Sequence, residues 1–460
     1  MDPLPEPLVL DFDGPLGVYE AAFDRRRIAA ATDERGRVTL VRPHAIVIDV
    51  PEGTQRAVDK ARKAIDADDE VVLMPETGAK PAGGVLGARI DGYDAKVDGK
   101  WRTRDLQGLL TRFSRRGFHV RPTHVYSSGI MGTPGVIGSP GVIGSPGVIG
   151  SPGVIGSPGV IGSPGVIGSP GVIGSPDLLF NTARRARRPE LGEPLGIKGR
   201  EQPNVLVLDT GLHTVKGKPE HPDLAGCAVI HEPWLDPTTP GAWDDEDEPD
   251  DDHRGQLDHQ GGHGTFITGI IRQLCPDARV HHAGVLSSFG DGDDVSVIAA
   301  IQRAHAWGVP IDIVVMSFGA YSIGDRPPPM TATIRRLLPD ALVVASAGND
   351  ATRRPFFPAA LPEVVAVGAL DSAGRASFSN YGPWVDACAP AVDVVSTFFT
   401  DFPGFEGWAA WSGTSFAAPK VAGVVAREMY LKKISAKDAW ARLQNYQRFH
   451  FPDLGQVFNF

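Results

Sequence analysis

Four side chains with the chemistry for acyl transfer lie in short motifs in the second half of the sequence. They are Asp209 in VLVLDTG, His263 in GGHGTF, Asn349 in VVASAGND and Ser415 in WSGTSFAAP. Each motif alone is more typical of a turn or a helix cap than of a catalyst. Together they supply a nucleophilic hydroxyl, a base for its proton, an acid to orient that base and an amide donor for an oxyanion. The order Asp, His, Ser is one of the orders in which such triads occur.

The pattern of apolar residues indicates the elements that position these side chains. Apolar strands are expected at 204–208, 311–316 and 341–345, and helices near 295–307 and 331–338. Strands that alternate with helices predict an α/β fold, in which helices flank both faces of a parallel sheet. Each of the four motifs lies at a strand end or at a helix start.

A smaller α+β unit is predicted upstream. Its elements follow the order strand, helix, strand, strand, helix, strand (βαββαβ). Such a fold carries many functions and decides none by itself. The expected strands are 44–50, 70–74, 87–97 and 118–126, and the expected helices begin at Thr54 and Thr103.

The hexapeptide GVIGSP is repeated seven times without substitution from Gly135 to Pro176. Proline at every sixth residue excludes a helix and interrupts any sheet ladder. An extended tether is therefore expected, and docking in a groove or a parallel β-helix are less favoured alternatives. The predicted domains are residues 1–126, a linker at 127–190 and residues 191–460.

The composition argues against several classes of protein. The 460 residues are 42% hydrophobic and 22% charged, as in soluble globular proteins, and no apolar run approaches the roughly 20 residues of a membrane span. The net charge of −10 comes mostly from eight acids within 244–252, and nucleic acid is not an expected partner. Three cysteines provide no disulfide framework, and the N-terminal residues do not read as a signal peptide. A cytoplasmic protein is expected.

Longer stretches around the four motifs resemble the catalytic domain of the subtilisin-like serine proteases, the subtilases. The resemblance extends over about residues 204–446. It includes HPDL at 221–224, MSFG at 316–319 and the segment 362–397 that leads to the serine. This combination is far more specific than any of the four motifs alone.

The resemblance implies a role for each of the four side chains. Ser415 is the nucleophile, His263 the general base and Asp209 the acid that orients the imidazole. The side chain of Asn349 and the backbone N–H of Ser415 bind the oxyanion. The implied substrate-binding residues are Ser317, Phe318 and Gly319 in one strand, and Gly290 and Gly292 in the edge segment SSFGDGDDV. Protein or peptide substrates are implied, and the chemistry requires no cofactor.

The resemblance also gives the upstream domain a meaning. Many subtilases carry a βαββαβ propeptide that inhibits the catalytic domain and places its C-terminal tail in the active-site cleft. The upstream domain has this element order and ends in HVY followed by SSG. An inhibitor in cis is thus implied, with the first cut between Tyr126 and Ser127. An independent binding module on the same fold is the alternative.

The sequence departs from the family at three places. Family members often hold structural calcium with the Asp of HPDL, here Asp223, and with a loop inserted after the catalytic His. That loop is missing, which argues against this calcium site, and no metal ligand is assigned. Phe416 follows the serine where the family usually has Met. The segment between Asn349 and Pro358 is short, so the residue preferred before the cut is not predicted.

Acidic residues near the motifs have two interpretations. The segment WDDEDEPDDD before His263 is either a solvated loop or a charged field that attracts basic substrates, a metal ion or the RRARR segment at 184–188. The solvated loop is the favoured interpretation. Asp291, Asp293 and Asp294 favour basic side chains at the non-primed subsites.

Together these patterns predict a serine endopeptidase that is regulated by its N-terminal domain. The alternative from another class is a peptide-binding or scaffold protein in which the repeat and the N-terminal domain are the functional parts.

Overall fold

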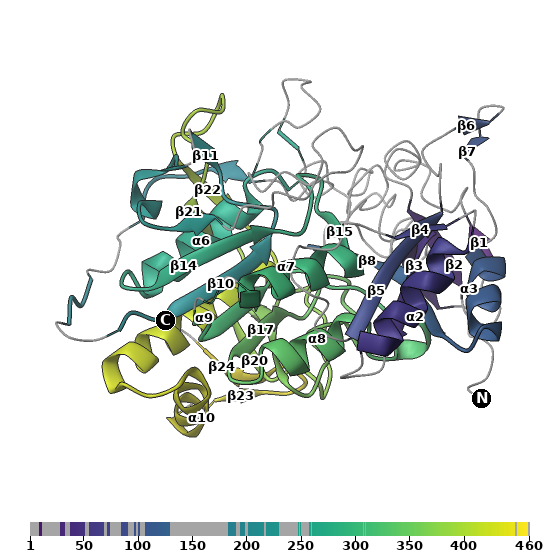
Figure 1. Cartoon of the computed structure of the whole chain (residues 1–460). Helices are drawn as coiled ribbons and strands as arrows, with labels where there is room; N and C mark the ends of the chain where they lie inside the picture. Colours follow the sequence, from purple (N-terminus) through teal and green to yellow (C-terminus); the bar gives the residue numbers. More distant parts are fainter. Residues whose placement is uncertain are drawn as a thin grey trace.

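A computed structural model shows how the elements of the chain are arranged (Figure 1). The repeat at 135–176 and most of the expected linker lie outside the residues that it describes. The described residues are 9–11, 28–32, 37–50, 55–68, 71–73, 84–90, 96–97, 100–101, 106–128, 183–189, 194–197, 201–215, 218–229, 247, 249, 257–258, 260–306, 308, 310–446 and 449–458.

The larger sheet is mostly parallel, and its order is β13-β14-β10-β16-β17-β18-β20-β24-β23, with β19 paired to β18. Neighbouring strands are parallel from β13 to β24, whereas β23 and β19 pair antiparallel. The strands are β10 (Asn204–Asp209), β13 (Ala228–Val229), β14 (Arg279–Gly284), β16 (Ile313–Met316), β17 (Leu342–Ser346), β18 (Val364–Asp371), β19 (Gly374–Arg375), β20 (Ala387–Pro390), β23 (His450–Phe451) and β24 (Gly455–Val457).

Helices cover both faces of this sheet, as the alternation of strands and helices predicts. Successive residues of a strand point to opposite faces. Val205 and Val207 of β10 therefore pack beneath α6 and α9, whereas Leu206 and Leu208 pack beneath α7 and α8. A strand that is buried on both faces must be apolar throughout, which explains the apolar run in the sequence. The helices are α6 (His263–Leu274), α7 (Asp294–Ala306), α8 (Met330–Leu337), α9 (Thr414–Lys432) and α10 (Ala436–Tyr446).

The bounds of the predicted elements in this region are close to those observed. Strands β10, β16 and β17 and helices α7 and α8 begin and end within two residues of the expected positions. None of the described helices is both long enough and apolar enough to cross a membrane.

The smaller sheet is antiparallel and is built around β3 (Val38–Val50), which pairs with β2, β5 and β8. From β3 to β8 the elements follow the predicted order βαββαβ, with α2 and α3 packed on the apolar cluster of the sheet. Two strands that precede β3 were not expected, and the predicted strand 87–97 is divided into β5 and a short β6-β7 hairpin. The elements are β1 (Val9–Asp11), β2 (Ala29–Thr32), α2 (Gln55–Asp66), β4 (Val71–Leu73), β5 (Gly84–Ile90), β6 (Lys96–Val97), β7 (Lys100–Trp101), α3 (Leu106–Arg115) and β8 (His119–Ser127).

Strand β8 connects the two parts of the molecule. It pairs with β3 along most of its length, and its last residues pair antiparallel with β15 (Asp291–Asp293). Figure 1 shows β8 and β15 side by side between the smaller and the larger sheet. The remaining short elements are β9 (Arg184–Arg185), β11 (Thr214–Val215), β12 (Lys218–Pro219), η2 (Pro222–Leu224), η3 (Ile323–Asp325), β21 (Val394–Thr397) and β22 (Trp408–Trp411).

The close packing of α6 on β21 generates a stability prediction at Gly269. Alanine in a helix interior ordinarily improves stability by up to about 1 kcal/mol relative to glycine. Here, however, a Cβ would lie 2.1 Å from Oγ1 of Thr397 and 2.4 Å from Oγ of Ser396. Both hydroxyls donate to carbonyl groups of α6, so neither turns away without losing a buried hydrogen bond.

We therefore expect Gly269→Ala to lower the free energy of unfolding by about 1–3 kcal/mol in a urea titration. An unchanged or higher midpoint of unfolding would show that there is room for a Cβ between α6 and β21.

Candidate active site

Asp209 and His263 come together because β10 ends where α6 begins. Nδ1 of His263 lies 2.6 Å from Oδ1 of Asp209, and the same oxygen accepts the backbone N–H of Thr210 at 2.8 Å. Both side chains are at most 1% exposed. A carboxylate that accepts from Nδ1 fixes the tautomer of the imidazole and leaves Nε2 free to act as a base.

The glycines before His263 are explained by the turn that begins α6. Gly262 has a φ of +83°, which L-amino acids with a Cβ rarely adopt. A Cβ on Gly262 would also lie 2.2 Å from the ring of Phe398. Only glycine lets the chain enter the helix at this angle and present His263 to Asp209.

The same turn is held from beneath by Asp247, whose side chain is fully buried. Its carboxylate accepts from the backbone N–H groups of Gly262 at 2.8 Å and Thr265 at 3.1 Å. It also accepts from the hydroxyls of Thr210 at 3.0 Å and Thr265 at 2.8 Å. Burial raises the pKa of Asp247 to about 6, and the Thr265 and Gly262 donors act in the opposite direction. Asp247 thus ties the end of β10 to the start of α6.

Asp247 was not recognised as a site residue in the sequence because it stands among other acids. The interpretation of its segment as a solvated loop is wrong for this residue, since Asp247 has no exposed surface. The other acids of 244–252 lie outside the described residues. In the RRARR segment, Arg184 pairs with Asp393 and Arg188 with Asp223, which are acids outside 244–252.

Ser415 is the second residue of α9 and is 2% exposed. Its Oγ lies 3.0 Å from the carbonyl oxygen of Ser128 and 3.1 Å from that of Ser317. Among the described residues these are its hydrogen bonds, and none joins it to His263. In this state the hydroxyl of Ser415 is thus directed to two backbone carbonyls, one of them in the tail of the N-terminal domain.

Asn349 is oriented by Thr414, the residue before the serine. Oδ1 of Asn349 accepts from the backbone N–H of Thr414 at 2.9 Å and from its hydroxyl at 2.8 Å. Because both donors engage the oxygen, Nδ2 must point elsewhere, and it lies 3.5 Å from where a Cβ on Gly413 would be. The N–H donors of the amide are therefore placed beside the backbone that leads to Ser415. Thr414 was missed in the sequence, where only its place in the GTS motif marks it.

The predicted substrate-binding glycines surround the end of β8. Gly319 and Ser127 exchange two backbone hydrogen bonds of 2.9 Å, and the carbonyl of Gly290 accepts the N–H of Ser128 at 3.2 Å. Gly292 is paired with Tyr126. The tail of the N-terminal domain is thus an added strand between two backbone segments of the larger domain.

The other two predicted substrate-binding residues contact the same tail and the serine. The ring of Phe318 lies edge-on to that of Tyr126, with 5.8 Å between centroids. Oγ of Ser317 donates to the carbonyl of Ser415 at 2.8 Å. One further contact was not indicated by the sequence. Oγ of Ser128 donates to Oε1 of Gln260 at 2.9 Å.

The structure places the predicted processing site out of register with Ser415. The side chain of Tyr126 is fully buried, and its hydroxyl donates to Oδ1 of Asp294 at 2.7 Å. This anchor fixes the strand so that the carbonyl at Ser415 belongs to Ser128 and not to Tyr126. A first cut between Tyr126 and Ser127 does not fit this arrangement. The bond within reach of the serine lies at Ser128 or beyond it.

The acids of the edge segment are engaged by the N-terminal domain. Arg42 of β3 pairs with Asp291 at 3.0 Å and with Asp293 at 3.3 Å, and all three side chains are nearly or fully buried. Asp294 accepts the backbone N–H of His124 at 2.7 Å. In this state the chain itself supplies the basic partners of the segment.

Asp223, which the family resemblance connects with structural calcium, pairs with an arginine in this structure. Its Oδ1 accepts from the guanidinium of Arg188 at 3.0 Å, and its backbone N–H donates to Nδ1 of His221. Helix α6 also continues from His263 to Leu274 without an inserted loop. A cationic side chain already balances this carboxylate.

The three cysteines offer no alternative nucleophile. All are free and buried. Burial raises the pKa of Cys227 and Cys275 to about 11 and that of Cys388 to about 12. They are therefore uncharged thiols at neutral pH, and the thiolate is the reactive form.

A second buried histidine, His282 of β14, lies behind the Asp209–His263 pair. Its Nε2 would be 2.8 Å from a Cβ on Gly264, and its side chain has no exposed surface. Burial lowers the pKa of His282 to about 4, and the charge of Asp209 opposes this shift. His282 is therefore neutral in the folded protein at neutral pH.

This depressed pKa predicts a loss of stability in acid. An unfolded histidine has a pKa near 6.5, so between about pH 6.5 and 4 the unfolded chain binds a proton that the folded chain does not. Stability falls as the pH drops through this window, by at most about 3 kcal/mol.

Urea unfolding of the Ser415→Ala chain and of the same chain with His282→Asn, at pH 7 and pH 4.5, measures this contribution. The comparison cancels the titration of groups that do not interact with His282, such as Asp247. We expect the chain that retains His282 to lose more stability on acidification than the chain with His282→Asn. Equal losses would exclude His282 as the source.

Comparison with known proteins gives two family matches. The model of the subtilase family matches residues 201–445. A second model, for the collagen triple helix repeat, matches residues 127–177. Glycine recurs at every third position of GVIGSP, which is the spacing of glycine in collagen sequences.

Several curated proteases are similar to this chain. A thermophilic serine proteinase of Bacillus sp. (strain AK1) is 32% identical over 245 residues, which are 50% of this chain and 52% of that protein. Subtilisin Savinase of Lederbergia lenta is 32% identical over 240 residues, 48% of this chain and 74% of that protein. A crystal structure of a cold adapted subtilisin-like serine proteinase aligns with a TM-score of 0.42 at 22% identity and covers 55% of this chain and 87% of that chain.

The chain spans about half the length of most of the curated proteases that it matches. The subtilase match nevertheless covers more than half of the chain and contains all four motifs of the predicted site. This chain belongs to the subtilase family.

Proposed function

We propose that this protein is a serine endopeptidase that hydrolyses peptide bonds through an acyl-enzyme on Ser415. The observation that carries the proposal is the 2.6 Å contact between Asp209 and His263, whose ring lies 5.4 Å from that of Phe416, the residue after a serine that contacts an extended backbone strand. The naming of its relatives as proteases supports the same activity.

In the proposed reaction Oγ of Ser415 attacks the carbonyl carbon of the bound peptide while Nε2 of His263 takes the hydroxyl proton. Asp209 stabilises the imidazolium that forms. His263 then gives the proton to the leaving amine, and the C–N bond breaks. Water, deprotonated by the same imidazole, attacks the acyl-enzyme, releases the carboxylate product and restores Ser415.

The negative charge of the tetrahedral intermediate requires donors that are already in position. Nδ2 of Asn349 and the backbone N–H of Ser415 are proposed for this role. The hydrogen bonds from Thr414 to Asn349 hold the amide before substrate arrives, so no energy is spent on orienting it during the reaction.

The N-terminal domain is proposed to inhibit this activity in cis. Its tail lies on the same backbone groups of Gly290, Gly292 and Gly319 that a peptide substrate would use, and Ser128 faces the nucleophile. The ion pairs of Arg42 hold the domain in place. Since breaking a buried ion pair by removing one partner typically costs about 3–5 kcal/mol, this side chain is a strong determinant of docking.

We expect Arg42→Met to raise the activity of the full chain toward a short fluorogenic peptide. A loss of about 3 kcal/mol shifts the equilibrium between docked and displaced domains by about a hundredfold. Arg115→Met, on the exposed surface of α3, removes the same charge and is the matched control. Equal activity of the two variants would mean that the domain is a binding module and not an inhibitor.

The Arg42→Met chain also provides the test of the proposed activity. Adding Ser415→Ala should lower kcat by at least about 10⁴-fold and abolish labelling by a fluorophosphonate. Asn349→Ala should lower kcat by about 10²–10³-fold with little change in KM, a magnitude taken from another member of the family. If Ser415→Ala retains both hydrolysis and labelling, the proposed nucleophile is wrong. If no chain is labelled, the scaffold interpretation is favoured.

A further inference from the structure

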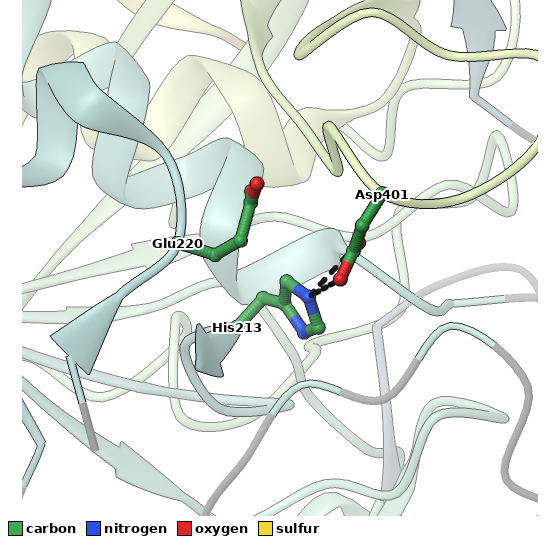
Figure 2. A group of neighbouring side chains, drawn as sticks. All are labelled: His213, Glu220 and Asp401. Atoms are coloured by element: carbon green, nitrogen blue, oxygen red, sulfur yellow. Dashed lines mark hydrogen bonds and ion pairs between the residues drawn. The ribbon is translucent and has the colours of Figure 1, made fainter. Parts of the chain in front are cut away.

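Three potential metal ligands from two loops lie close together, and one of them contacts the backbone of Asp247. His213 precedes β11 and Glu220 follows β12, so this small hairpin brings them together, and the N–H of Glu220 donates to the carbonyl of His213. Asp401 comes from the loop after β21. One ligand atom from each residue lies within 4.8 Å of the other two. Figure 2 shows the three side chains, with dashed lines joining His213 to Asp401.

The orientation of the His213 ring is fixed by a backbone group outside the cluster. Nδ1 of His213 lies 3.0 Å from the carbonyl oxygen of Asp247 and must be protonated to form this hydrogen bond. The ring is only 8% exposed, so it has little freedom to turn. In the neutral ring Nε2 then carries the lone pair, which is how metal-binding histidines are commonly prepared.

In this tautomer the unprotonated Nε2 of His213 faces the carboxylate of Asp401. Nε2 lies 3.1 Å from Oδ1 and 3.2 Å from Oδ2 of Asp401. Two atoms bound to one tetrahedral zinc ion are about 3.4 Å apart, given ligand distances near 2.1 Å. The side chain of Asp401 is 51% exposed, which leaves the group open to solvent for entry of an ion and for a bound water.

The second carboxylate adds to the negative charge at this place. Oε2 of Glu220 accepts the backbone N–H of Thr400 at 3.3 Å, which holds it beside Asp401. Two carboxylates and one imidazole are a ligand set suited to a divalent transition metal, whereas calcium prefers oxygen ligands alone.

We infer that His213, Glu220 and Asp401 bind a divalent transition-metal ion of the zinc class, with water as a further ligand. Nothing in the proposed peptidase reaction requires this ion. It links the β11-β12 hairpin to the loop after β21. Through His213 it also reaches Asp247, which holds the start of α6. The ion is therefore expected to stabilise the fold around the catalytic pair.

The inference is tested with the full chain carrying Ser415→Ala, which cannot digest itself by the proposed mechanism. After removal of metals by a chelator, the chain is titrated with Zn²⁺ alone in a calorimeter, and its unfolding is followed with and without the ion. At a hundredfold excess over Kd, bound Zn²⁺ should raise Tm by about 5–10 °C. Ca²⁺ at the same concentration should not.

Single variants distinguish this site from other surface histidines and acids. His213→Asn, Glu220→Gln and Asp401→Asn should each weaken the binding of Zn²⁺ by about tenfold or more. Glu406→Gln is the matched control. Glu406 lies in the same loop as Asp401, but it pairs with Arg185 and is not part of the His213 cluster. Binding that is unchanged in all three variants, or absent from the parent chain, would overturn the inference. In the second case the cluster is an ordinary surface pairing of His213 with Asp401.

Discussion

The hydrogen bond between Asp209 and His263 is the interaction on which the rest of the site depends. It joins the end of a central strand to the first residue of a helix, and neither backbone position is adjustable because both elements are buried in the core. Asp247 reinforces the junction with donors on both sides of it. The burial of three ionisable groups at one place is tolerated because each of the two carboxylates accepts hydrogen bonds and the imidazole supplies a donor.

Polar groups at the substrate edge of the larger domain are likewise satisfied by hydrogen bonds, here with the N-terminal domain. A strand between β15 and Gly319 completes the hydrogen bonding of two backbone segments. Arg42 adds a cationic partner to the buried acids Asp291 and Asp293 of β15, and Tyr126 donates to Asp294 at the start of α7. The requirement to satisfy polar groups thus links the tail of the N-terminal domain to the substrate edge of the larger domain.

Much of the fold and of the site follows from local patterns in the sequence. Apolar runs locate β10, β16 and β17, and the glycines of GGHGTF mark a turn that only glycine permits. Asp247 escapes prediction because a carboxylate among seven other acids looks solvated, and only its distant partners bury it. The register of the tail escapes it as well, because the pocket that anchors Tyr126 is assembled from β15, α7 and Phe318. Both failures concern contacts between residues far apart in the chain.

Acylation of Ser415 during turnover is the step on which the proposed reaction depends. The most direct measurement is mass spectrometry of the Arg42→Met chain after rapid acid quenching during hydrolysis of an activated ester. We expect a covalent acyl adduct on the peptide that contains Ser415, and we expect it to be lost when the quench is delayed until the substrate is exhausted. An adduct on a different residue, or hydrolysis with no adduct at any quench time, would contradict the proposed reaction.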